Sequence, residues 1–308
     1  MKRFLIQVTI FSLIIAGFLA AGEYAIRQMP NPYKYKHRWM QQNAGSVETL
    51  ILGSSHTYYG INPAMLPGKA FSLANVSQDY KYDLLLLEQY ADSCKSLRNV
   101  IIPVSYFSFF DPDLECSNEW YCAIYYKIYM GIDIHPALSK YNFELSHLSV
   151  YSGKIRNLLS FSYPDIDCDS LGFGNRFTLA DRQQDWESHW AEIVNRHTAK
   201  DWNNVSTQTR RLTEILTFCQ SRSVNVILIT TPTWHKYYEN LDPRQLQKMY
   251  DIVHDLQARY GVTYIDYLKD PRFTADDFHD CDHLSTDVGA IKFTRILCRD
   301  IFRNTIAR

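Results

Sequence analysis

Short apolar runs alternate with longer stretches of helical periodicity in two blocks of this chain, and this alternation limits its fold more than any other feature. Five apolar runs lie at residues 47–52, 70–73, 99–104, 224–229 and 262–265. The helical stretches lie at residues 80–97, 206–222, 243–261 and 285–306. Strands that alternate with helices form parallel sheets with helices on both faces. We therefore predict an α/β fold, a three-layer sandwich around a mostly parallel sheet.

Residues 105–203 interrupt this pattern, because they are rich in aromatic side chains and poor in periodicity. We expect an insertion or lid here, with a helix at Cys122–Met130 and a loop at 169–175, and not a separate domain. The whole chain contains 22 Tyr, 16 Phe and 6 Trp. These rings either fill the core and half-buried surface, or stack on sugars or contact lipid.

The amino terminus carries a targeting signal. Lys2 and Arg3 precede residues 4–22, which hold no charge. About 20 apolar residues span a bilayer, and basic residues stay on the cytoplasmic side. A cleaved signal peptide is the alternative, since small residues follow at 19–22. We predict, in order, a membrane anchor, a polar and aromatic connector and an outward-facing domain, at residues 1–25, 26–45 and 46–308.

Charge and cysteine content limit which binding partners, disulfides and metal sites the chain can have. The chain has 32 basic and 33 acidic residues, so it lacks the basic excess that is typical of proteins that bind nucleic acid. Export permits disulfides, and seven cysteines leave at least one thiol unpaired. Cys116 and Cys122 are close enough to close a local loop, whereas Cys219 and Cys298 are expected as buried thiols. No Cys/His cluster has the spacing of a structural zinc site, so we predict no metal and no organic cofactor.

A candidate nucleophile follows the first apolar run, in Gly53-Ser54-Ser55. Serine needs a base that is held by a third group. His283 and Asp280 lie between the last strand and the last helix, and the carboxyl ends of parallel strands meet at one sheet edge. Ser55 would attack, His283 would accept its proton, and Asp280 would orient the imidazole.

Other residues near these two stretches have alternative interpretations. Ser54 is the nucleophile if the register differs by one, and His56 is expected as a structural or rim residue. His279 and Asp282 are spare candidates in the same loop as Asp280 and His283. His279 is expected to be exposed, and Asp282 to be solvated or to cap the last helix. Two residues that follow a strand on the same edge either line a substrate groove or belong to an ordinary loop: Trp234 and His235.

These motifs resemble the SGNH/GDSL hydrolase superfamily, whose fold is flavodoxin-like. Gly53-Ser54-Ser55 stands where that family has Gly-Asp-Ser, and residues 280–284, with Gly289-Ala290 following, look like its terminal Asp-x-x-His block. The Gly-Ser-Ser variant looks more like a membrane-anchored branch with teichoic-acid D-alanylation proteins and, more distantly, alginate acetylation proteins. The resemblance covers about residues 47–104 and 206–306. It implies a cell-envelope glycan or acyl donor as ligand, and a membrane-bound O-acyltransferase as partner.

The sequence departs from the family pattern at the oxyanion-binding blocks. Residues 72–78 lack the family's Gly, and no Gly-x-Asn-Asp follows Val104. Backbone amides at Ser55 and near Ser77, or the Asn75 side chain, are the remaining candidate donors. Loss of one such donor typically costs about 10²–10³ in rate, so a slow or partner-dependent enzyme is expected.

The resemblance implies O-acyl transfer to, or ester hydrolysis on, a cell-envelope glycan through an acyl-Ser55 intermediate. A plain esterase for small or lipid esters would keep the same three residues. An alternative of a different class is a non-catalytic envelope protein that keeps the fold and binds glycan or an acyltransferase.

Overall fold

The computed structural model describes residues 1–134, 139–160 and 166–306. Its centre is a sheet of five parallel strands in the order β2-β1-β3-β4-β5. That order is the flavodoxin-like one, and it confirms the predicted α/β class. The strands are β1 Thr49–Ile51, β2 Ala70–Ser72, β3 Asn99–Pro103, β4 Asn225–Thr230 and β5 Thr263–Asp266.

The sheet is buried on both faces. Ile51, Ile101 and Ile227 are paired across β1, β3 and β4, and they belong to one buried cluster with Phe293 and Leu297 of the last helix. Successive side chains of a strand point to opposite faces. The alternate residues Leu50, Val100 and Leu228 are fully buried too, so a second helical layer must cover the other face, as in doubly wound sheets.

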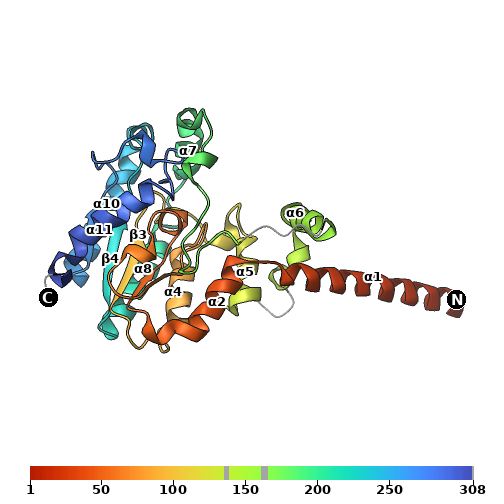
Figure 1. Cartoon of the computed structure of the whole chain (residues 1–308). Coiled ribbons are helices and arrows are strands. Elements are labelled where there is room, and N and C mark those ends of the chain that lie inside the picture. The colour runs from red at the N-terminus through yellow and green to blue at the C-terminus, as the bar shows by residue number, and fades with distance from the viewer. Residues whose placement is uncertain (135–138, 161–165, 307–308) are drawn as a thin grey trace. The chain divides into compact units, whose positions relative to one another are not determined.

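The helices supply both layers (Figure 1). Helix α11 packs on one face of the sheet. Helices α4, α8 and α10 contact one another in that order. The helices are α1 Lys2–Gln28, α2 Pro32–Asn43, α3 Ser55–Tyr58, α4 Tyr80–Tyr90, α5 Cys122–Met130, α6 Leu148–Leu159, α7 Trp190–His197, α8 Val205–Ser221, α9 His235–Tyr238, α10 Pro243–Tyr260 and α11 Gly289–Ile306.

Two predicted helix boundaries are wrong. Helix α4 ends at Tyr90 and not near residue 97, where Asp92 and Ser93 are residue types that favour turns over helix interiors and the Ser93 amide donates to Tyr90 O at 2.9 Å. Helix α11 begins at Gly289 and not at Ser285, whose Oγ accepts a hydrogen bond from the Gly289 amide at 3.0 Å. Residues 169–175 form the expected turn, closed by a bridge between residues 168 and 174.

The described chain forms two compact units. One unit holds residues 1–37 and 119–166, and the other holds 38–118 and 167–308, which include the sheet. The predicted insertion at 105–203 therefore contributes α5 and α6 to the first unit and α7 to the second. The predicted domain boundaries themselves remain a prediction.

Helix α1 is long and apolar enough to cross a membrane, although a signal sequence meets the same criteria. The segment predicted as a connector at 26–45 is largely helical, because α1 extends to Gln28 and α2 begins at Pro32. Asn31 Oδ1 accepts hydrogen bonds from the amides of Tyr33 and Lys34 at 2.9 and 3.2 Å. Pro32 occupies the first helical position, where its missing N–H costs nothing.

All seven cysteines are free thiols. The local disulfide considered for Cys116 and Cys122 is not formed. Cys219 is buried as expected, and Cys298 is half-buried.

Candidate active site

The turn after β1 holds the candidate nucleophile, and its geometry requires glycine. Gly53 has φ +98°, and a Cβ at this position would lie 2.2 Å from two side-chain atoms of Pro103. A residue with a side chain would therefore be strained and would clash with the end of β3. The tight turn brings the chain directly into α3, whose first residue is Ser55.

Ser55 and His283 meet at the carboxyl edge of the sheet, although 228 positions separate them in the chain. Ser55 Oγ lies 2.8 Å from His283 Nε2. Ser55 is half-buried, and the His283 side chain is 11% exposed. Ser54, the alternative nucleophile, is buried and makes no side-chain hydrogen bond to the helix that it precedes.

Asp280 lies against the other nitrogen of the same imidazole. Its Oδ1 and Oδ2 are 3.0 and 3.1 Å from His283 Nδ1. Asp280 Oδ1 also accepts hydrogen bonds from the backbone amides of Asp282 and His283, at 3.0 and 2.8 Å. An ionised carboxylate only accepts hydrogen bonds, so the neutral imidazole carries its proton on Nδ1 and presents a free Nε2 lone pair to Ser55.

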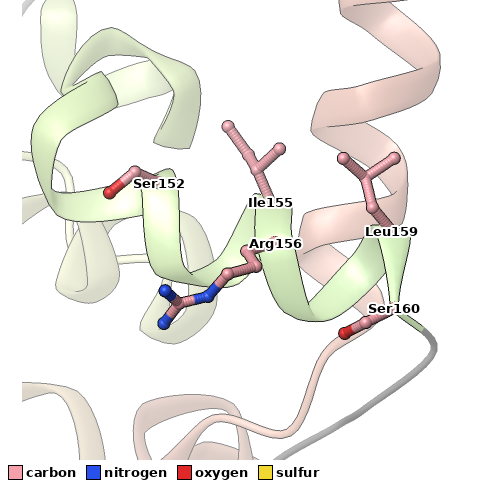
Figure 2. A pocket seen from close by; sticks show the side chains of 5 residues that line it. All are labelled: Ser152, Ile155, Arg156, Leu159 and Ser160. Atoms are coloured by element: carbon pink, nitrogen blue, oxygen red, sulfur yellow. The ribbon is translucent and has the colours of Figure 1, made fainter.

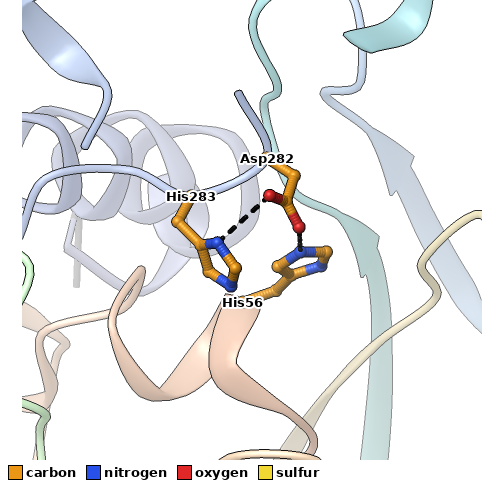
Figure 3. Close-up of side chains that lie close together, drawn as sticks. All are labelled: His56, Asp282 and His283. Carbon is orange, nitrogen blue, oxygen red and sulfur yellow. Dashed lines mark hydrogen bonds and ion pairs between the residues drawn. The ribbon is translucent and has the colours of Figure 1, made fainter. Parts of the chain in front are cut away.

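A second carboxylate faces this imidazole from the buried side, and the sequence predicted it only as a spare candidate that is solvated or caps a helix. Asp282 is 1% exposed and not solvated, and it does not cap α11. Its Oδ1 lies 3.3 Å from His283 Nδ1, and its Oδ2 lies 3.1 Å from His56 Nε2. Figure 3 shows the Asp282 carboxylate between the two imidazoles.

His56 is a buried member of this cluster and not a rim residue. Its Nδ1 lies 2.7 Å from Ser105 Oγ, just beyond the end of β3. Since His56 Nε2 faces a carboxylate, it carries the proton, and Ser105 donates its hydroxyl hydrogen to Nδ1. His197 completes the surroundings, with Nδ1 at 3.8 Å from Asp282 Oδ2 and 2.8 Å from the Tyr237 hydroxyl.

The charges of this cluster fall on Asp280, Asp282 and His283, and not on the other two imidazoles. Burial lowers the pKa of His56, and it lowers the pKa of His197 to about 3, so both rings are neutral. Burial acts in the same direction on His283, but the charges of Asp280 and Asp282 outweigh it and raise the His283 pKa well above its usual range. Burial opposes ionisation of Asp282, yet His283 and the hydrogen bond from His56 hold its pKa well below the usual value. These directions give an ion pair between Asp282 and a readily protonated His283.

His56, Asp282 and His283 also come close enough to hold a cation, with donor atoms within 4.8 Å of one another. However, both histidine nitrogens that face Asp282 carry protons for carboxylate oxygens, and His56 Nδ1 is taken by Ser105. Hydrogen bonds and ion pairing account for the cluster, so we assign no metal to it.

The oxyanion candidates lie on the turn beside Gly53. The side-chain amide of Asn75 donates through Nδ2 to Leu73 O at 3.1 Å and to Gln78 Oε1 at 3.2 Å. Both hydrogens of the Asn75 side chain are thereby used within the protein. Ser77 has φ +59°, a left-handed conformation that favours glycine. Within the described residues, the backbone amides of Ser55 and Ser77 donate no hydrogen bond to the protein, so they are the free donors here.

Trp234 and His235 follow β4, and both are half-buried. The Trp234 amide donates to Cys281 O at 2.9 Å, which ties β4 to the loop of Asp280 and His283. Its ring packs against Trp186 at 5.6 Å. The His235 side chain is 41% exposed and pairs with Glu239, so its imidazole reaches solvent.

Phe177 was not predicted as a site residue. Its ring lies edge-on to His283, with centroids 5.3 Å apart, and stacks on His279 at 4.3 Å. His279 is therefore half-buried and not exposed. Phe177 has φ +66°, which is rare for a bulky residue. No sequence signal marks such a position, because left-handed φ values are expected at Gly, Asn or Asp.

A separate hollow of about 540 Å³ lies along α6, in the other compact unit (Figure 2). It is lined by Ser152, Ile155, Arg156, Leu159 and Ser160. These side chains come from one helix and its end and include no acid or imidazole, so we assign no chemistry to this hollow.

No family model and no curated protein sequence matches the chain. Among solved structures, a candidate acylhydrolase from Bacteroides fragilis aligns with a TM-score of 0.40 and 11% identity, over 87% of this chain and 95% of its own. A GDSL-like lipase from Bacteroides thetaiotaomicron aligns with a TM-score of 0.42 and 10% identity, over 89% and 99%. Likenesses this distant carry no functional conclusion.

Proposed function

We propose that this protein is an SGNH-type serine hydrolase or O-acyltransferase that works through an acyl-Ser55 intermediate. One observation carries the proposal: Ser55 Oγ is 2.8 Å from His283 Nε2, and His283 Nδ1 is 3.0 Å from Asp280 Oδ1. A hydroxyl, an imidazole and a carboxylate in this order are the parts that nucleophilic acyl transfer needs.

In the first half-reaction, Ser55 Oγ bonds to the carbonyl carbon of an ester, while its proton passes to His283 Nε2. The carbonyl oxygen becomes negative, and the free amides of Ser55 and Ser77 are the donors proposed to stabilise it. The intermediate then collapses. The bond to the leaving alcohol breaks, and that oxygen takes the proton from His283, which leaves the acyl group on Ser55.

In the second half-reaction, His283 removes a proton from an incoming hydroxyl, which attacks the acyl-Ser55 carbonyl. Water as the nucleophile gives hydrolysis, and a sugar hydroxyl gives transfer. Asp280 stays ionised in both halves and holds the imidazole in position. Ser55 Oγ leaves with the proton from His283, so the enzyme returns to its starting state.

The proposed substrate class is the O-acyl groups of a cell-envelope polysaccharide. Two features support it: the resemblance of the Gly-Ser-Ser and Asp-x-x-His motifs to envelope acylation proteins, and helix α1, which is long and apolar enough for a membrane anchor. The domain would then lie on the extracytoplasmic side, and a membrane-bound O-acyltransferase is the proposed partner. Phe177 and Trp234 are aromatic candidates for contact with a sugar ring.

A non-catalytic envelope protein is the second candidate. The Asn75 amide supports it, because both of its hydrogens are bonded inside the protein and neither is free for an oxyanion. Such a protein would bind glycan or an acyltransferase and would show no reactive serine.

Labelling with a serine-reactive fluorophosphonate separates these candidates. We expect the full-length protein to be labelled, and Ser55→Ala and His283→Ala to lose at least nine-tenths of the label. Ser54→Ala is the matched control and should retain it. If folded wild-type protein stays unlabelled, or if Ser54→Ala alone abolishes labelling, the assignment of Ser55 is wrong. In cells, the acyl content of the envelope polysaccharide should fall with Ser55→Ala if the substrate class is right.

A further inference from the structure

We infer that Asp282 is a second carboxylate that acts on His283, a positioning residue that shares the Nδ1 proton with Asp280 and stabilises the charged imidazole. The inference rests on the proposed function, in which His283 becomes an imidazolium in each half-reaction. It adds a fourth residue to the Ser55, His283 and Asp280 chain.

The two carboxylates approach the same nitrogen from different environments. The Asp280 side chain is 27% exposed, whereas that of Asp282 is fully enclosed. Water screens the charge of Asp280, but little solvent screens the charge of Asp282. Although Asp282 lies 3.3 Å from Nδ1, slightly farther than Asp280, its unscreened charge therefore still favours the imidazolium.

Asp282 is held rigidly by neutral partners, which leave its charge available to His283. His56 Nε2 donates to Oδ2 at 3.1 Å, and Ser105 fixes the tautomer of His56 from its other side at 2.7 Å. Among the described residues, the one contact of Asp282 Oδ1 with a cationic or donor group is its ion pair with His283 Nδ1 at 3.3 Å, and no further hydrogen bond satisfies this oxygen. Oδ1 is therefore the oxygen through which the charge of Asp282 acts on His283.

A purely structural role does not account for this arrangement. A buried carboxylate with an unsatisfied oxygen costs stability, and an apolar side chain would pack at less cost. The unsatisfied oxygen becomes useful when His283 gains a proton, because the imidazolium can then direct Nδ1–H to either carboxylate. Asp282 would also keep the imidazole oriented if Asp280 were exposed to bulk water or removed.

The groups that face His283 define how its protonation should respond. Asp280 and Asp282 favour the charged ring. His56 and His197 are neutral. The burial of His283 among these rings and beside Phe177 disfavours the charged imidazole. Removal of either carboxylate should therefore lower the pKa of His283, and removal of both should leave burial dominant.

Nuclear magnetic resonance of histidine-labelled full-length protein tests the inference without any turnover. We expect Asp282→Asn to lower the pKa of His283 by about 1 to 3 units, the range typical of a close opposite charge. Asp276→Asn is the matched control, since it makes the same change at an exposed acid of the same loop, and it should leave the titration unchanged. A His283 titration in Asp282→Asn that matches wild type overturns the inference.

Asp280→Asn gives a second arm in case Asp282→Asn does not fold. We expect His283 to keep a pKa above about 6.5, the unperturbed value, because Asp282 still faces Nδ1. A pKa below that value in Asp280→Asn also overturns the inference. Failure of the proposed function looks different: fluorophosphonate would not label Ser55, whatever the histidine titration showed.

Discussion

The backbone amide of Gly53 donates a hydrogen bond to Asp83 Oδ1 at 2.8 Å. This contact joins the turn of the candidate nucleophile to the first turn of α4. Gln78 Nε2 donates to the same oxygen at 2.6 Å, and Asn75 bonds to Gln78. The turn beside Ser55 and the turn that holds Ser77 are thus braced by one buried acid.

Asp83 makes stability depend on pH. Burial raises its pKa to about 7, against the opposing hydrogen bonds from Gln78 and Gly53, and its Oδ2 has no partner in the described structure. The folded state therefore binds a proton that the unfolded state releases near pH 4. The stability that the protonated Asp83 contributes is complete below about pH 4, and it is lost as pH rises through about 7.

Asp83→Asn should remove this dependence, because its amide oxygen still accepts both hydrogen bonds without an ionisation cost. We expect the variant to be more stable than wild type at pH 8 by about 1 to 3 kcal/mol, and to differ little at pH 4. Urea unfolding at the two pH values measures this. Equal stabilities at pH 8 would show that Asp83 is not held protonated in the fold.

Gly53→Ala tests the geometry of the nucleophile turn. The new Cβ would meet Pro103 at 2.2 Å, and φ +98° is unfavourable for alanine. We expect a loss of about 2 kcal/mol or more in the free energy of unfolding, or no soluble protein. Gly153→Ala is the control: it lies in α6 with nothing near its Cβ, and it should gain up to about 1 kcal/mol. Similar effects of the two changes would argue against a required glycine at residue 53.

Most of the fold could be predicted from the sequence, because strand and helix periods differ and strands of a doubly wound sheet alternate with helices. The proximity of Ser55 and His283 followed from topology alone, since loops after parallel strands share one edge. Asp280 was recognisable by its spacing from His283. These inferences need no knowledge of side-chain packing.

The rest depended on packing that the sequence does not display. Asp280 and Asp282 are two residues apart in an irregular loop, where no periodicity tells which carboxylate is buried. His56 was expected as a structural or rim residue, yet the short helix α3 directs the side chains of both Ser55 and His56 into one cluster. Phe177 reaches His283 from a segment with no regular structure.

Ser77→Gly separates an amide role from a hydroxyl role at Ser77. A left-handed conformation costs a non-glycine residue about 1–2 kcal/mol, and Ser77 has φ +59°. We expect Ser77→Gly to stabilise the protein by about 1 kcal/mol and to keep wild-type fluorophosphonate labelling, because the amide remains. Ser77→Ala keeps the strain and removes only the hydroxyl, so it should label normally too. Loss of labelling in both variants would transfer the role to the hydroxyl.

The pH dependence of Ser55 labelling should report the ionisation of His283. Only the unprotonated Nε2 can accept the Ser55 proton, and Asp280 and Asp282 outweigh burial and raise the His283 pKa well above its usual value. The labelling rate should therefore rise with pH and level off only above about 6.5, the unperturbed pKa. Asp282→Asn should move this midpoint to lower pH, whereas Asp276→Asn should not. Rates are measured with an uncharged fluorophosphonate and corrected for its spontaneous hydrolysis. A midpoint below about 6.5 in wild-type protein would mean that burial, and not the two carboxylates, controls the imidazole.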